Sequence, residues 1–121
     1  MNREIKFRAY SSNRKEMLYQ EDKMSFNIDF KQQKVLISKN QNDYIGGSFD
    51  NLPIMQFTGL KDVNGKDIYE DDILEHPNSG RFEIKFEDYG FYLFYNGYKQ
   101  ISHTTEYMEI IGNIHENPEL L

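Results

Sequence analysis

The chain has 121 residues, no cysteine and a formal net charge of -6. This length fits one domain with a sizeable core, and the lack of cysteine excludes disulfides, thiolate nucleophiles and thiolate zinc sites. No stretch approaches the roughly 18 apolar residues of a transmembrane helix, and the charged N-terminus has no apolar signal-peptide segment. We therefore expect a soluble, cytoplasmic protein with no membrane partner.

The first fifty residues predict two strand pairs. Apolar and polar residues alternate over residues 5–10, and a polar turn at 11–15 leads into Met17–Tyr19, which predicts a hairpin. A stricter alternation over residues 24–30 is followed, after a polar turn, by the apolar residues 35–37. This pattern predicts a second hairpin with one buried face.

Residues 38–48 form a polar stretch with two adjacent glycines. Such a composition is typical of a flexible connection, and we predict a hinge there. It would separate an N-terminal β layer, residues 1–48, from a barrel-like core, residues 49–121. A long hairpin loop is the alternative interpretation.

The middle of the chain continues in short strands and tight turns. Asn64-Gly65 predicts a type I′ hairpin turn, because both central residues of that turn need a positive φ. Residues 82–86 alternate as a strand, and residues 91–95 run into a second Asn-Gly turn at Asn96-Gly97. Several short strands at this spacing suggest a small barrel or sandwich.

At the C-terminal end, residues 107–114 predict a closing strand with a bulge at Gly112. A helix over residues 104–111 is the alternative. Asn117 as an N-cap and Pro118 at the first helical position predict one short helical turn. The predicted fold class is therefore all-β (mainly β), with at most short helical turns.

An acidic stretch around Gly65 is the first candidate for a metal or catalytic site. Its acidic residues are Asp62, Asp67, Glu70, Asp71 and Asp72. Counted from Asp62, the glycine is fourth rather than sixth, so the register of a helix-loop-helix calcium site fails. In a strand, residues 70 and 72 would share a face while residue 71 points away. We expect solvated or turn-binding carboxylates, no metal and no cofactor.

The histidines also lack a recognisable site pattern. His76, His103 and His115 are scattered, without metal-ligand spacing. The tetrapeptide 103–106 combines an imidazole, two hydroxyls and a carboxylate, but neighbouring residues cannot form a catalytic triad by themselves. No glycine-rich phosphate-binding motif is present, so we predict no catalytic residue.

An aromatic stretch, residues 91–98, is the strongest candidate for an interface. Aromatic side chains can stack on the nucleobases of single-stranded nucleic acid. Residues 87–98, however, contain two acidic residues and no Lys or Arg. A core or protein-interface role is therefore favoured, with the stretch covered by the N-terminal layer or by a second subunit. The predicted interface residues are Phe91, Tyr92, Phe94, Tyr95 and Tyr98.

Charge is distributed unevenly along the chain. Residues 1–40 carry nine Lys/Arg against five Asp/Glu, whereas residues 41–121 carry five against fifteen. Nucleic-acid binding generally needs a basic face, and only the N-terminal third could provide one. The candidate phosphate contacts are Arg3, Lys6, Arg8, Arg14 and Lys15. Head-to-tail association, a basic partner and an ordinary solvated surface are the alternatives.

Three segments together resemble a known family. "REIKFRAY" (residues 3–10), "MQFTGLKDVNGKDIYEDDIL" (residues 55–74) and "YMEIIGNIHENPELL" (residues 107–121) are similar to the YopX family of phage and prophage proteins. The resemblance implies a single domain, residues 1–121, with a mostly β fold and a small SH3-like barrel, and a phage or prophage origin. It implies no established activity. Asp71 stands where the family often has glycine.

These observations favour a non-enzymatic protein-interaction or assembly module. It would act in the bacterial host cytoplasm, associate with itself and bind a host protein. Two alternatives are open: a nucleic-acid accessory protein or acidic nucleic-acid mimic, and a metal-dependent enzyme that uses the acidic stretch for a reaction such as phosphodiester hydrolysis.

Overall fold

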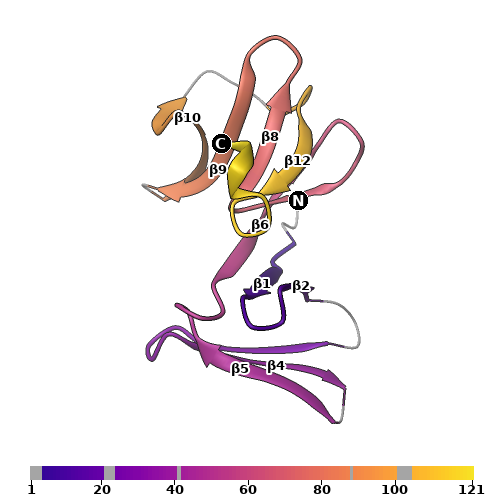
Figure 1. Ribbon diagram of the computed structural model, residues 1–121, viewed down its shortest axis with the longest axis vertical. Coiled ribbons are helices and arrows are strands. Elements are labelled where there is room, and N and C mark those ends of the chain that lie inside the picture. The colour runs from indigo at the N-terminus through magenta and orange to yellow at the C-terminus, as the bar shows by residue number, and fades with distance from the viewer. Residues whose placement is uncertain (1–3, 21–23, 41, 88, 101–104) are drawn as a thin grey trace. The chain divides into compact units, whose positions relative to one another are not determined.

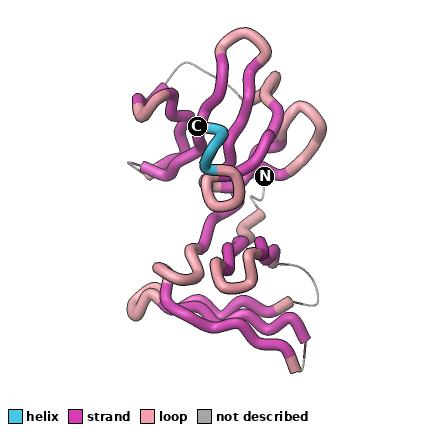
Figure 2. The backbone as a smooth tube through the Cα atoms, viewed as in Figure 1, coloured by secondary structure: helices cyan, strands magenta, loops and turns pink. Residues whose placement is uncertain are grey.

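The computed structural model describes residues 4–20, 24–40, 42–87, 89–100 and 105–121. Strands make up almost all of the regular secondary structure of these residues (Figure 2), and no helix among them is long and apolar enough to cross a membrane. The predicted all-β class is confirmed. The chain divides into two compact units: residues 6–55, and residues 56–121 together with the N-terminal residues through Ile5.

The unit of residues 6–55 contains both predicted hairpins. It contains the antiparallel pair β1–β2, which belongs to a four-stranded sheet, and a three-stranded antiparallel sheet in the order β3-β4-β5. In Figure 1, β4 and β5 lie side by side in purple. The strands are β1 (Phe7–Ser11), β2 (Glu16–Tyr19), β3 (Ser25–Asp29), β4 (Lys34–Asn40) and β5 (Asp43–Ser48).

The predicted hinge is wrong. Residues 38–48 belong almost entirely to β4 and β5, which pair with one another as Ser38 opposite Tyr44, and residue 41 lies outside the described residues. The alternative of a hairpin is correct, with a much shorter loop. The first compact unit extends through residue 55, and Leu52, 3% exposed, packs into its core with Ala9 and Ile37.

The unit of residues 56–121 is built around a five-stranded antiparallel sheet, in the order β11-β10-β9-β8-β12. Figure 1 labels β8, β9, β10 and β12 of this sheet. Strand β6 begins in the first unit and continues into this one, where it pairs with β7. The strands are β6 (Ile54–Lys61), β7 (Asp67–Tyr69), β8 (Asp72–His76), β9 (Gly80–Glu87), β10 (Gly90–Tyr95), β11 (Tyr98–Gln100) and β12 (Glu109–Asn113).

One face of the five-stranded sheet is packed against β7 and forms the core of this unit. Leu74, Phe82, Ile84 and Leu93 supply the sheet side, each at most 5% exposed, and Ile68 of β7 is fully buried among them. Apolar side chains at every second strand position produce this one-sided burial. The SH3-like barrel that the resemblance implies stays a prediction.

The two Asn-Gly pairs adopt different turns. Asn96 and Gly97 have φ values of 50° and 85°, which confirms the type I′ turn between β10 and β11. In the loop of residues 62–66, only Gly65 has a positive φ, 82°. The predicted type I′ turn is wrong there, because the Asp62 carboxylate binds two backbone N–H groups and organises a longer loop.

The C-terminal prediction is confirmed for the strand and its bulge. Strand β12 changes pairing register between Ile110 and Gly112, and residues 105–111 form no helix. A short 3-10 turn, Pro118–Leu120, follows (cyan in Figure 2). Asn117 does not cap it through its side chain, because Asn117 Oδ1 accepts a hydrogen bond from the backbone N–H of Asn113 instead, at 3.3 Å.

Candidate interaction groove

Asp62, the first residue of the acidic stretch, is a structural acceptor. The residue is 6% exposed. Its Oδ1 accepts from the backbone N–H groups of Asn64 and Lys66, both at 2.9 Å, and its Oδ2 accepts from that of Ile110 at 3.0 Å. Burial acts to raise the pKa of Asp62, but these three donors outweigh it and hold the pKa below its ordinary value. Asp62 therefore joins the loop of residues 62–66 to β12.

The other carboxylates of the stretch also have separate partners. Asp72, 2% exposed, accepts from the backbone N–H of Tyr69 at 2.7 Å, and Asp67 pairs with Lys61 at 2.9 Å. Glu70 and Asp71 lie in the turn between β7 and β8, so the strand alternation considered for residues 70–72 does not apply to them. Across the described residues, no three His, Asp or Glu side chains are placed to hold a metal ion.

Asp71 keeps the backbone conformation that a glycine would adopt. Its φ is 71°, in the left-handed region that glycine occupies without strain and aspartate tolerates better than most residues. Its N–H donates to the carbonyl of Ile84 at 2.8 Å, its carbonyl accepts from Ile114 at 3.0 Å, and its Oδ2 lies 2.9 Å from Nε2 of His115. The side chain thus adds a contact to the C-terminal segment that glycine could not make.

His115 was not singled out by its sequence position, since its partner lies 44 residues away. His76 accepts a hydrogen bond at Nδ1 from the backbone N–H of Asn78 in the turn after β8. His103 lies outside the described residues.

Arg8 is a predicted phosphate contact that the fold encloses. It is 2% exposed, its Nε donates to the sulfur of Met55 at 3.3 Å, and its guanidinium carbon lies 5.9 Å from the centroid of the Tyr19 ring. A guanidinium in this position is surrounded by protein, so Arg8 cannot reach a phosphate.

The remaining basic candidates are divided among different environments. Arg14 forms a two-point pair with Asp43, at 2.9 and 3.3 Å. Lys15 is exposed at the turn between β1 and β2, Lys6 is half-buried, and Arg3 lies outside the described residues. Of the five predicted contacts, the structure therefore offers Lys15 as an exposed cation and Arg14 as one already paired.

The five predicted interface aromatics divide between the two faces of the sheet. Strand alternation puts Phe91 and Tyr95 on the face that carries the core residue Leu93, and Tyr92 and Phe94 on the opposite face. Tyr98 of β11 is directly opposite Tyr95 and so shares its face. The predicted set is therefore not one surface.

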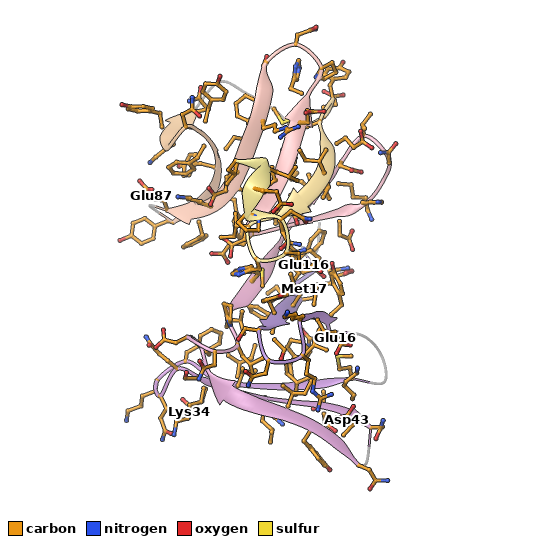
Figure 3. The ribbon with its side chains drawn as sticks, viewed as in Figure 1. Glu16, Met17, Lys34, Asp43, Glu87 and Glu116 are labelled. Atoms are coloured by element: carbon orange, nitrogen blue, oxygen red, sulfur yellow. The ribbon has the colours of Figure 1, made fainter. Side chains whose placement is uncertain are left out.

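On the opposite face, lysines from neighbouring strands cover the rings. Lys99 Nζ lies 4.6 Å from the centroid of Tyr92, and Lys85 Nζ lies 5.3 Å from that of Phe94. Lys99 also pairs, at 3.4 Å, with Glu87, labelled at the end of β9 in Figure 3. Phe94 is only 7% exposed. The aromatic segment contains no basic residue, but the neighbouring strands β9 and β11 place Lys85 and Lys99 against its rings.

A small cavity of about 390 Å³ lies next to Phe94, bounded by Arg81, Glu83 and Leu120. Burial is the main reason that the pKa of Glu83 lies above its ordinary value; the negative charge of Asp71 adds to this effect, and Lys85 opposes it. Arg81 is already bonded to Glu75 and to the Leu120 carbonyl. This cavity is thus bounded by groups that hold the C-terminal segment.

A larger cavity, about 600 Å³, opens between β6 and β10, and we call it the β6–β10 groove. Leu60 of β6, Ile84 of β9, and Phe91 and Leu93 of β10 form its apolar walls, with Gln100 of β11 at one side. Every one of these residues belongs to the unit of residues 56–121. The groove is therefore a property of that unit.

A bulge in β6 explains why an apolar side chain stands at the rim of the groove. Pairing of β6 with β7 is irregular between Phe57 and Lys61, and Gly59 within this segment has a φ of 89°. Leu60, the next residue, is 52% exposed. Thr58 donates its hydroxyl to the carbonyl of Ile68 at 2.7 Å and accepts from the N–H of Leu60, so its polar atom is already satisfied.

Exposed aromatic rings continue the apolar surface along the same face of the sheet. Phe86, Tyr95 and Tyr98 are 52%, 42% and 75% exposed. Phe86 meets Phe91 of the groove edge-to-face, at 5.1 Å between centroids. Strand β11 is also the end of its sheet, and an end strand offers backbone groups to an added strand. This combination suits an extended polypeptide with apolar side chains.

The comparisons with known proteins agree with this architecture. The crystal structure of protein EF1440 from Enterococcus faecalis is similar in fold, with a TM-score of 0.67, 28% sequence identity and 99% of each chain covered. No curated protein matches the chain. The family model described as YopX protein matches residues 6–121. The chain therefore belongs to the YopX family.

Proposed function

We propose that this protein is a non-enzymatic protein-interaction module, encoded by a phage or prophage and acting in the bacterial cytoplasm. In this proposal the β6–β10 groove holds an extended apolar segment of a partner protein, and the end strand β11 adds backbone hydrogen bonds. One observation carries the proposal: Leu60, Phe86, Tyr95 and Tyr98 are all 42% or more exposed and lie in one unit.

Leaving these apolar side chains in water costs free energy that a partner protein would recover. Burying apolar surface stabilises a complex by about 25 cal/mol for each Å² removed from water. Clustered exposed aromatic and leucine side chains are typical of surfaces that another protein covers. The acidic stretch supports this reading indirectly, because its carboxylates are engaged within the fold.

Site-specific photo-crosslinking tests the proposal. A benzophenone amino acid replaces Leu60 or Tyr98 in the full chain, expressed in bacteria. The matched control replaces Leu36, which is 45% exposed in the other unit. We expect protein adducts from positions 60 and 98 and none from position 36. An adduct of twice the chain mass identifies a second copy as the partner.

Two results would overturn the proposal. The first is an adduct pattern that is the same at all three positions, or empty at positions 60 and 98. The second is a set of adducts that nuclease treatment removes, which would favour the nucleic-acid accessory role.

A further inference from the structure

We infer that the occupant of the β6–β10 groove is a basic segment, in which Lys or Arg side chains flank apolar ones. This inference rests on the proposed function and specifies the chemistry of its partner. Its basis is the charge of the unit that contains the groove. Residues 56–121 carry five Lys/Arg against thirteen Asp/Glu, a net charge of -8.

The cations of this unit are largely neutralised within it. Four of the five Lys and Arg side chains in residues 56–121 have an acidic partner within 4 Å. These pairs are Lys61–Asp67, Arg81–Glu75, Lys85–Glu83 and Lys99–Glu87. The field outside the unit is therefore negative, and it favours the approach of a positively charged segment over a negative one.

The same imbalance holds at the groove itself. Lys61 and Glu106 are the charged residues that line it. Lys61 is paired with Asp67 at 2.9 Å, whereas Glu106 is exposed. When Lys61 is counted together with its partner Asp67 as neutral, Glu106 leaves one negative charge at the groove. Apolar walls with an acidic rim are complementary to a segment that inserts apolar side chains and leaves basic ones at the edge.

The geometry of the end strand sets the spacing of such a segment. Residues of an added strand alternate between the two faces of a sheet. Side chains of the added strand that lie on the face of Tyr98 and Gln100 would meet the groove. Those on the face of Lys99 would meet the Lys99–Glu87 pair. We therefore expect apolar residues at every second position of the segment.

Selection from a random linear peptide library tests this inference. The bait is the full-length protein, with counter-selection on the Leu60→Asp variant, whose fold is checked by circular dichroism. We expect the selected peptides to be rich in Lys and Arg with apolar residues at alternate positions. Their affinity, measured by fluorescence anisotropy, should fall severalfold between about 50 mM and about 500 mM salt.

Two matched charge variants test whether the basic side chains of the peptide lie at the rim of the groove. Glu106→Lys and Glu119→Lys change the net charge equally, but only Glu106 lines the groove. We expect a loss of peptide affinity of about tenfold for Glu106→Lys and a much smaller loss for Glu119→Lys. Equal losses, or no loss for either variant, would overturn the placement of the basic side chains at the rim.

The basic occupant and the groove itself are tested by different outcomes of the selection. Selected peptides that are acidic or uncharged, yet do not bind Leu60→Asp, would overturn the basic occupant and leave the interaction groove in place. A selection that yields no peptide able to distinguish the wild type from Leu60→Asp would overturn the groove, and with it the proposed function.

Discussion

The acidic segment, residues 62–72, and the aromatic segment, residues 91–98, are the two most distinctive parts of the unit formed by residues 56–121. In the acidic segment, Asp62 and Asp72 are nearly inaccessible and bind backbone N–H groups. In the aromatic segment, Tyr95 and Tyr98 remain 42% and 75% exposed. These two carboxylates are satisfied inside the fold, whereas these two tyrosine rings are left in water.

This difference reverses the usual expectation that acids face solvent and aromatics are buried. A carboxylate that accepts several backbone N–H groups is stabilised where it lies, so it is poorly placed to bind anything else. An exposed ring retains its unfavourable hydration until a partner covers it. The aromatic segment, rather than the acidic one, is therefore the region where binding is expected.

Replacing Asp62 is expected to have the largest effect on the free energy of unfolding. In Asp62→Ala, three backbone donors lose their acceptor at a buried position, and we expect the free energy of unfolding to fall by about 3 kcal/mol. The matched control is Asp67→Ala, which removes a pair with the exposed Lys61 and should cost less than about 1 kcal/mol. Urea unfolding followed by circular dichroism measures both, and equal costs would contradict the structural role of Asp62.

The two Asn-Gly turns provide a second contrast between the segments. Asn96 has a φ of 50°, and Asn64 does not adopt the left-handed region. We expect Asn96→Ala to lower the free energy of unfolding by about 1 kcal/mol, because alanine is strained at positive φ. Asn64→Ala should cost less than about 0.5 kcal/mol. Urea midpoints of the two variants test this; a larger cost at residue 64 would be inconsistent with the turn geometries.

Two substitutions at Asp71 distinguish how much its backbone conformation and its side-chain contact each contribute to stability. Both Asp71→Gly and Asp71→Ala lose the contact with His115. Glycine adopts a φ of 71° without strain, whereas alanine is strained there. We expect the glycine variant to be the more stable of the two by roughly 0.5–1 kcal/mol. Thermal and urea unfolding of both variants measure the difference, and a more stable alanine variant would rule out the glycine-like backbone role.

The pH dependence of stability should have opposite signs for Asp62 of the acidic segment and for Glu83, which lies on β9 opposite Phe94 of the aromatic segment. The pKa of Asp62 is lowered in the folded state, so its contribution is present above the unfolded value of about 3.9 and is lost as the pH falls through the folded value. The pKa of Glu83, opposite Phe94, is raised. Its contribution is present below the unfolded value of about 4.3 and is lost as the pH rises through the folded value.

Urea midpoints measured between about pH 3 and about pH 7 test these signs. Asp62→Asn should reduce the loss of stability on the acidic side, and Glu83→Gln should reduce the loss as the pH rises. If both variants changed the same side of the profile, the opposite environments of the two carboxyl groups would be refuted.

Local chemistry in the sequence determined much of the secondary structure. Alternation with a period of two predicted the strands, the Asn96-Gly97 pair predicted its turn, and Gly112 predicted the bulge in β12. These features depend on the conformational preferences of neighbouring residues, which a single sequence displays. The failed hinge at residues 38–48 shows the limit: polar residues and glycines there still pair as strands.

The tertiary structure alone decided which side chains are engaged and which are free to bind. Asp62 reaches the N–H of Ile110, 48 positions away, and Lys85 and Lys99 reach rings of β10 through the register of the sheet. The β6–β10 groove likewise joins Leu60 to Phe91. Strand register and long-range packing set these contacts. Changing the register by one residue would turn every side chain to the opposite face, and local sequence preferences do not specify that choice.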